Sequence, residues 1–163
     1  MKKVLVVMGS DSDLKVMEKC VDRLKSFDIP VEVRICSAHR TPAVAEQLAK
    51  NAAEEGFGVI IAAAGKAAHL GGVLAAYTTL PVIGVPMATS VMGGMDSLLS
   101  IVQMPKGIPV ATVAIDGADN AAILAAQMIA LSDEALAARL AAFKADMAAE
   151  VTAKDEKVRA QFA

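Results

Sequence analysis

The chain has 163 residues, of which 55% are hydrophobic and only 3% aromatic, and its formal net charge is −2 at pH 7. This length fits one domain with an aliphatic, alanine-rich core. The nearly balanced charge and the lack of a basic run argue against a nucleic-acid-binding protein.

The mean hydropathy of +0.50 is high for a small protein, so a membrane span has to be considered. The most apolar stretch, residues 57–77, is long enough to cross a bilayer, but Lys66 and His69 lie near its centre and glycines interrupt it. A central lysine alone costs about 2.5–3.5 kcal/mol on insertion. We therefore expect no membrane contact and attribute the apolar excess to surfaces buried between subunits of a homo-oligomer.

The cysteines and the N-terminus favour a cytoplasmic protein. Cys20 lies in a helical pattern and Cys36 at the end of a strand pattern, with no CxxC motif and no Cys/His cluster. Disulfides and a metal site are therefore not expected. The apolar run at residues 4–7 is too short for a secretion signal.

Short β-rich runs alternate with helical stretches, which is typical of a parallel sheet covered by helices on both faces. The predicted strands are residues 4–8, 31–36, 59–64, 82–85 and 110–115, and the predicted helices are 11–27, 42 to about 55, a short one after the loop at 65–72 that ends at about 77, 96–102 and 120–131. Ser12 or Asp11 is suited to cap the first helix, and Thr41-Pro42 has the form of a cap followed by proline at the first helical position. The helix at 120–131 is apolar on all sides, which predicts burial on every side.

A last helix is predicted from a cap at Ser132 to about residue 158. An apolar stripe repeats every three or four residues along it, formed by Leu136, Leu140, Phe143, Met147 and Val151. At 1.5 Å per residue this helix is roughly 40 Å long, so it should reach a neighbouring subunit unless its last turns fray into solvent. We expect one catalytic domain over residues 1–163, with a core at about 3–131 and an oligomerisation helix at about 132–158.

Polar, glycine-containing stretches follow the predicted strands, at residues 9–13, 37–42, 65–72, 87–94 and 116–120. In a parallel sheet these connections meet at one edge. The opposite edge has only ordinary turns, at 28–30, 54–56 and 78–81. This asymmetry predicts a ligand site at the carboxyl ends of the strands.

The stretch 37–42 reads Ser-Ala-His-Arg-Thr-Pro. Histidine side chains change charge near neutral pH, and the planar guanidinium of arginine suits phosphate or carboxylate. His39 and Arg40 are therefore candidates for proton transfer and anion binding, with Ser37 beside them. A solvated turn is the alternative for such a pair.

The stretch 9–13 opens a helix, where Ser10, Ser12 and free amides can hold a phosphate and Asp13 suits ribose hydroxyls. A plain helix cap is the alternative. The pattern is neither GxGxxG nor GxxxxGK[ST], so NAD and ATP are not indicated. A phosphoryl-accepting receiver domain needs a lysine after the last strand, and residues 116–119 contain none.

The stretch 65–72 brings small residues and bare backbone beside a ligand. Gly65, Lys66 and His69 are its candidates for substrate binding, and a flat heterocycle could lie against it. A histidine packed on a backbone carbonyl is the alternative for His69.

Four motifs together resemble the family of N5-carboxyaminoimidazole ribonucleotide mutases (class I, PurE) of de novo purine synthesis. They are Gly-Ser-Asp-Ser-Asp at 9–13, Ser-Ala-His-Arg-Thr-Pro at 37–42, the loop at 64–72 and Asp-Ser-Leu-Leu-Ser-Ile-Val-Gln-Met-Pro at 96–105. The resemblance implies a flavodoxin-like three-layer α/β/α fold with a five-stranded parallel sheet and a long C-terminal helix packing on neighbouring subunits, usually in an octamer. It also implies an isomerase that moves a carboxylate from the exocyclic nitrogen to C4 of an aminoimidazole ribonucleotide.

The resemblance further implies that the enzyme uses no metal, ATP, biotin or other cofactor. Within the site, it gives the ribose phosphate to Ser10 and Asp13, the phosphate to Arg40, and general acid and base catalysis to His39. One imidazole can serve both steps if CO2 is retained between them.

Two residues depart from the family loop, because Lys66 stands where a glycine is common and Gly71 where a proline is common. A related type, which carboxylates aminoimidazole ribonucleotide directly with CO2, carries a basic residue just after the Ala-Gly. That type lacks the Ala-His-Leu found here and typically has lysine at the position of Arg40. The direct carboxylase is the near alternative, and a non-catalytic nucleotide-binding module on the same fold is a more distant one.

Overall fold

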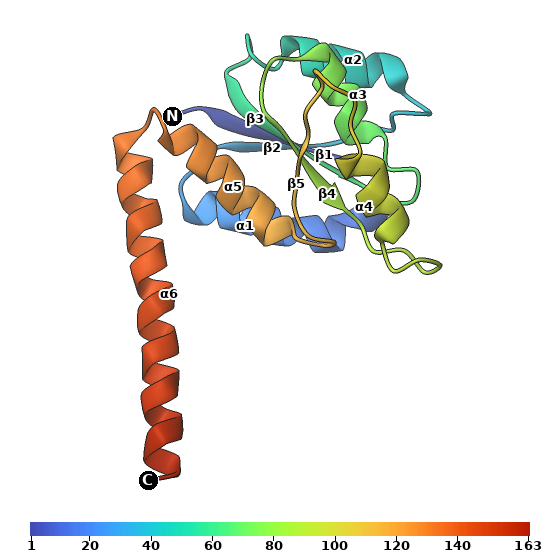
Figure 1. The fold of residues 1–163 in the computed structure, drawn as a ribbon. Helices are drawn as coiled ribbons and strands as arrows, with labels where there is room; N and C mark the ends of the chain where they lie inside the picture. The colour runs from blue at the N-terminus through green and yellow to red at the C-terminus, as the bar shows by residue number, and fades with distance from the viewer.

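The computed structural model describes residues 1–163, and a five-stranded, all-parallel sheet lies at its centre (Figure 1). The strand order is β2-β1-β3-β4-β5. The strands are β1 (Lys3–Met8), β2 (Val31–Ile35), β3 (Phe57–Ala64), β4 (Val82–Pro86) and β5 (Ala111–Thr112). The helical elements are the short 3-10 turn η1 (Asp11–Asp13), α1 (Leu14–Ser26), α2 (Pro42–Asn51), α3 (Leu70–Tyr77), α4 (Met95–Val102), α5 (Ala118–Ala130) and α6 (Glu134–Gln161).

Alternating side chains of the interior strand β1 divide the core between the two faces of the sheet. Val4, Val6 and Met8 join a cluster with residues of α1 and α5. Leu5 and Val7 join a second cluster with residues of α2, α3 and α4. The sheet is apolar on both faces because both are covered, as expected for parallel strands. The predicted three-layer, flavodoxin-like architecture is confirmed.

Three local predictions need correction. The fifth strand is only Ala111–Thr112, much shorter than 110–115, because only these two residues pair with its one neighbour, β4. The cap of the first helical turn is Ser10 rather than Ser12 or Asp11, because the Ser10 hydroxyl accepts the amide of Ser12. The cap of α6 is Asp133 and not Ser132, with its carboxylate accepting the amide of Leu136 at 3.0 Å.

Helix α5 is buried on one side rather than on every side. Ala121, Ala122 and Ala125 are fully buried, whereas Asn120 and Gln127 are exposed. The small alanine side chains let this helix lie close to α1 and the sheet. The apolar pattern therefore overstated the burial of α5 within one subunit.

Helix α6 has 28 residues, about 42 Å of helix, and extends away from the sheet (Figure 1). Leu136 is buried, and the ring of Phe143 packs edge to face on Phe27 with 5.4 Å between centroids. Beyond Phe143 every residue is exposed, including Met147 and Val151 of the predicted stripe.

The apolar stretch 57–77 is divided between strand β3 and the eight-residue helix α3. No helix of the protein combines the length and the apolar composition that crossing a bilayer requires.

Candidate active site

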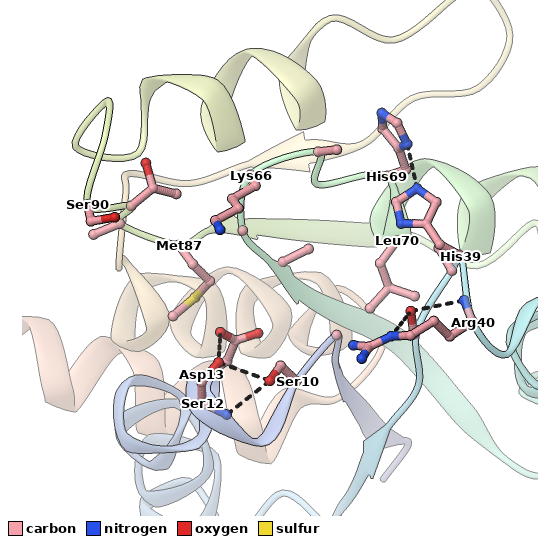
Figure 2. Close-up of a pocket in the computed structure, with 18 residues that line it drawn as sticks. Ser10, Ser12, Asp13, His39, Arg40, Lys66, His69, Leu70, Met87 and Ser90 are labelled. Carbon is pink, nitrogen blue, oxygen red and sulfur yellow. Dashed lines mark hydrogen bonds between the residues drawn. The ribbon is translucent and has the colours of Figure 1, made fainter.

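A cavity of about 480 Å3 lies at the carboxyl edge of the sheet, between the loops that follow β1, β2, β3 and β4 (Figure 2). All nine residues selected from the sequence line it, namely Ser10, Ser12, Asp13, Ser37, His39, Arg40, Gly65, Lys66 and His69. The structure thus brings together four stretches that are far apart in the chain. This agrees with the rule that parallel strands present their ligand sites at this edge.

The fifth polar stretch, 116–120, does not line the cavity. The carboxylate of Asp116 instead accepts a hydrogen bond from the amide of Ala88 at 2.9 Å, so it fixes the loop after β4. That loop contributes Met87, Ala88, Thr89 and Ser90 to the cavity wall. None of these four was selected individually, and the only sequence signal for them was their position after a strand.

The loop after β1 is organised by Ser10. Its hydroxyl accepts hydrogen bonds from the amide of Ser12 at 3.3 Å and the hydroxyl of Ser12 at 3.0 Å. Asp13 is buried, and burial raises the pKa of its carboxyl above the usual value. Hydrogen bonds from Ser12 and from the backbone of Ser10 oppose this shift, and the charges of Asp116 and Asp11 add to it.

The loop at 37–42 closes on itself. The hydroxyl of Thr41 accepts the amide of Ser37 at 3.0 Å and donates to its carbonyl at 3.1 Å. Thr41 therefore occupies the cap position of α2 without using its side chain as a cap. The hydroxyl of Ser37 accepts the amide and Nε of Arg40, at 3.2 and 3.4 Å, which leaves the outer nitrogens of the guanidinium free for an anion.

Lys66 adopts a left-handed backbone conformation, with φ of 56°. Its amide donates to the hydroxyl of the fully buried Ser97 at 2.9 Å, and its carbonyl accepts the hydroxyl of Ser100 at 3.3 Å. No acidic side chain pairs with its ammonium. Figure 2 shows the side chain turned towards Met87, into the cavity, where the ammonium is available to a ligand.

Gly71, the second departure from the family loop, lies in the first turn of α3. The amides of this turn have no partner within a helix, so proline is tolerated there as well as glycine. The departure therefore leaves the local fold intact.

The two histidines of the chain contact one another. Nε2 of His39 and Nδ1 of His69 lie 2.8 Å apart, and the rings meet edge to face, with 5.0 Å between centroids and 76° between planes. His69 is therefore not bonded to a backbone carbonyl through this nitrogen. Sequence reasoning selected both histidines but not this contact.

The cavity combines an imidazole pair, a buried carboxylate and two cations, Arg40 and Lys66, that form no ion pair within the chain. No group of three or more His, Cys, Asp or Glu side chains is arranged to hold a metal ion. Such a site is suited to a small molecule with more than one anionic group and to proton transfer on it.

The chain matches known proteins over almost its whole length. Residues 3–150 match the family model described as AIR carboxylase. An N5-carboxyaminoimidazole ribonucleotide mutase of Mycobacterium leprae is 55% identical over 153 residues, covering 94% of this chain and 90% of the relative. A protein of the same name from Methanocaldococcus jannaschii is 52% identical, covering 98% of this chain and 99% of the relative.

The fold is also that of a solved relative. The crystal structure of Treponema denticola PurE superposes with a TM-score of 0.85 at 30% sequence identity, covering 94% of this chain and 96% of that one. With this fold and these relatives, the chain belongs to the AIR carboxylase family.

Proposed function

We propose that the protein is an N5-carboxyaminoimidazole ribonucleotide mutase of de novo purine synthesis. The relatives named above carry this activity in their names, and family membership favours an enzyme over a nucleotide-binding module. The observation that carries the proposal is the presence, in one cavity, of an imidazole for proton transfer and two cations without acidic partners. These match a substrate with a phosphate and a carboxylate.

The site residues divide between the two ends of this substrate. Arg40, positioned by Ser37, binds the phosphate together with Ser10 and Ser12, and Asp13 binds the ribose hydroxyls. The backbone at Gly65, which lines the cavity, lies against the flat imidazole. Lys66 and His69 lie at the opposite wall, with the ammonium of Lys66 near the migrating carboxylate.

His39 acts as general acid and then as general base. Protonated His39 gives a proton to the exocyclic nitrogen as the bond from this nitrogen to the carboxylate breaks and CO2 is released. C4 then attacks the retained CO2, and its proton passes to His39. The proton count closes, and no cofactor is needed if the cavity keeps CO2 from escaping.

The test of this assignment is His39→Asn, assayed for conversion of N5-carboxyaminoimidazole ribonucleotide by ultraviolet absorbance. We expect turnover to fall by about 10⁴-fold, since one group serves two proton transfers of about 10²-fold or more each. Product binding, measured by calorimetry, should stay within about threefold because Arg40 and Ser10 are untouched. Turnover within tenfold of the unmodified enzyme would reject the acid–base role.

The observation that favours a second candidate, direct carboxylation of aminoimidazole ribonucleotide, is the unpaired Lys66 in the cavity. An assay with either the carbamate or CO2 as donor, without added ATP or metal, separates the two. We expect turnover with the carbamate. In Lys66→Gly, which also suits the left-handed backbone, we expect a higher KM for the carbamate. An unchanged KM would show that the ammonium does not meet the carboxylate.

We further propose a cytoplasmic homo-oligomer, as an octamer by family resemblance. Cys20 and Cys36 are free thiols, as a reducing compartment allows. The exposed part of α6 and the apolar surface at Val91, Met95 and Leu99 are suited to neighbouring subunits. A stable monomer in sedimentation at micromolar concentration would contradict the assembly.

A further inference from the structure

The contact between the two imidazoles is supported on both sides by hydrogen bonds within the loops that carry them. On one side, Thr41 and Ser37 close the loop that carries His39. On the other, the amide of His69 donates to the carbonyl of Ala67, and His69 occupies the N-cap position of α3. The 2.8 Å separation therefore follows from the positions of the two loops, and it determines which nitrogen of His39 is available to a ligand.

A hydrogen bond between two imidazoles needs an N–H on one and a lone pair on the other. If His69 carries its hydrogen on Nε2, its Nδ1 accepts from Nε2–H of His39. No group of the chain is hydrogen-bonded to Nδ1 of His39, so this nitrogen is left for the substrate. With the opposite assignment, a neutral His39 would carry its hydrogen on Nδ1 and would have no lone pair there to take a proton.

We propose that His69 is a positioning residue that holds His39 as the tautomer with its hydrogen on Nε2. The role rests on the proposed mutase reaction, in which one nitrogen of His39 must first give a proton and then take one. Nδ1–H of the imidazolium passes its proton to the exocyclic nitrogen as the N–C bond breaks and CO2 leaves. C4 then bonds to CO2, and its hydrogen returns to Nδ1, which restores the imidazolium.

Nε2 of His39 keeps its hydrogen through both steps, and His69 accepts it throughout. The bond is strongest when His39 is an imidazolium, because a charged donor shortens and strengthens a hydrogen bond. His69 therefore supports the charged state without exchanging a proton with the substrate. This is the arrangement by which a partner on the far nitrogen fixes the tautomer of a working histidine.

The kinetic test compares His69→Phe with His69→Asn. Phenylalanine keeps a ring but offers no acceptor, whereas the amide oxygen of asparagine lies close to the place of Nδ1. We expect His69→Phe to lower kcat about 10- to 100-fold with KM within twofold, and His69→Asn to recover most of kcat. Equal loss in both variants, or a raised KM with kcat intact, would overturn the positioning role.

A second measurement needs no substrate. His39 and His69 are the only histidines, so imidazole 15N NMR of the labelled protein reports this pair directly. We expect neutral His39 to carry its hydrogen on Nε2 in the unmodified protein and to become a mixture of tautomers in His69→Phe. Hydrogen on Nδ1, or no change in the variant, would reject the proposal. If His39 carries its hydrogen on Nε2 but the protein has no mutase turnover, the proposed reaction is rejected and the positioning of His39 by His69 is not.

Discussion

Gly84, in the middle of β4, leaves room for helix α4, and alanine at this position should disturb the cavity from behind. A Cβ there would lie 2.3 Å from Cγ2 of Ile101 and 3.0 Å from Cγ1 of Val110. Ordinary carbon contacts are about 3.5–4.0 Å, so a neighbour must move by about 1 Å. Ile101 is β-branched, and its side chain has few other rotamers available in a helix. Helix α4 itself therefore has to shift.

Helix α4 carries Ser97, whose hydroxyl holds the amide of Lys66 at 2.9 Å. A 1 Å shift takes this bond beyond hydrogen-bond range and releases the loop after β3. Overpacking of this kind lowers the free energy of unfolding by about 1–3 kcal/mol, which lowers Tm by about 2–12 °C in a chain of this size. Misplacing the loop by about 1 Å should lower kcat up to about 100-fold.

Thermal unfolding and mutase turnover of Gly84→Ala test both effects. Gly71→Ala is the matched control, since its Cβ would meet Val110 and Ala62 at ordinary distances of 3.5 and 3.8 Å. Combining Gly84→Ala with Ile101→Ala removes the shorter of the two contacts, so the double variant should lose less stability than the sum of the single ones. The reasoning would be refuted if the stability losses of the two single variants simply added in the double variant. It would also be refuted if Gly84→Ala left Tm and turnover unchanged.

Two further substitutions test the helix starts. Asp13→Asn should raise Tm at pH 7, because burial raises the pKa of the folded-state carboxyl and ionised Asp13 then opposes folding. The advantage should vanish as the pH falls towards the ordinary carboxyl pKa of 3.8, where the unmodified Asp13 is protonated. A Tm difference between Asp13→Asn and the unmodified protein that stays the same across this pH range would contradict this prediction. Asp133→Ala removes the acceptor for the amide of Leu136 and should cost about 1 kcal/mol in chemical denaturation, with Ser132→Ala as the nearly neutral control. If Ser132→Ala lost more unfolding free energy than Asp133→Ala, Ser132 would be the capping residue.

The sequence predicts the layers and the edge that carries the site, because these depend on patterns that span whole elements. Strands such as Val4–Met8 are continuously apolar since both faces of the sheet are covered, and polar loops gather at one edge since all strands are parallel. The length of β5 is different. It depends on how far the chain runs beside β4, where only two residues pair, and no local pattern encodes this.

The contacts inside the site depend on distances between loops, and sequence reasoning did not predict them. His39 and His69 are 30 positions apart, and their contact requires the register of β1 between β2 and β3. Ser97 belongs to the motif at 96–105, but nothing in that motif indicates that its hydroxyl supports the amide of Lys66. Selecting residue types by loop position thus identified the members of the site but not their partners.

The outer part of α6, residues 148–161, is exposed to solvent along its whole length. A free helix of this length is marginal in water, so its helical content depends on whether another surface covers it. Circular dichroism across a dilution series should then read out association directly. When the proposed assembly dissociates, the helical signal should fall by the fraction of all helical residues that this segment contributes. The sheet and its covering helices should remain folded. The segment is thus a built-in reporter of the proposed assembly, with no label required.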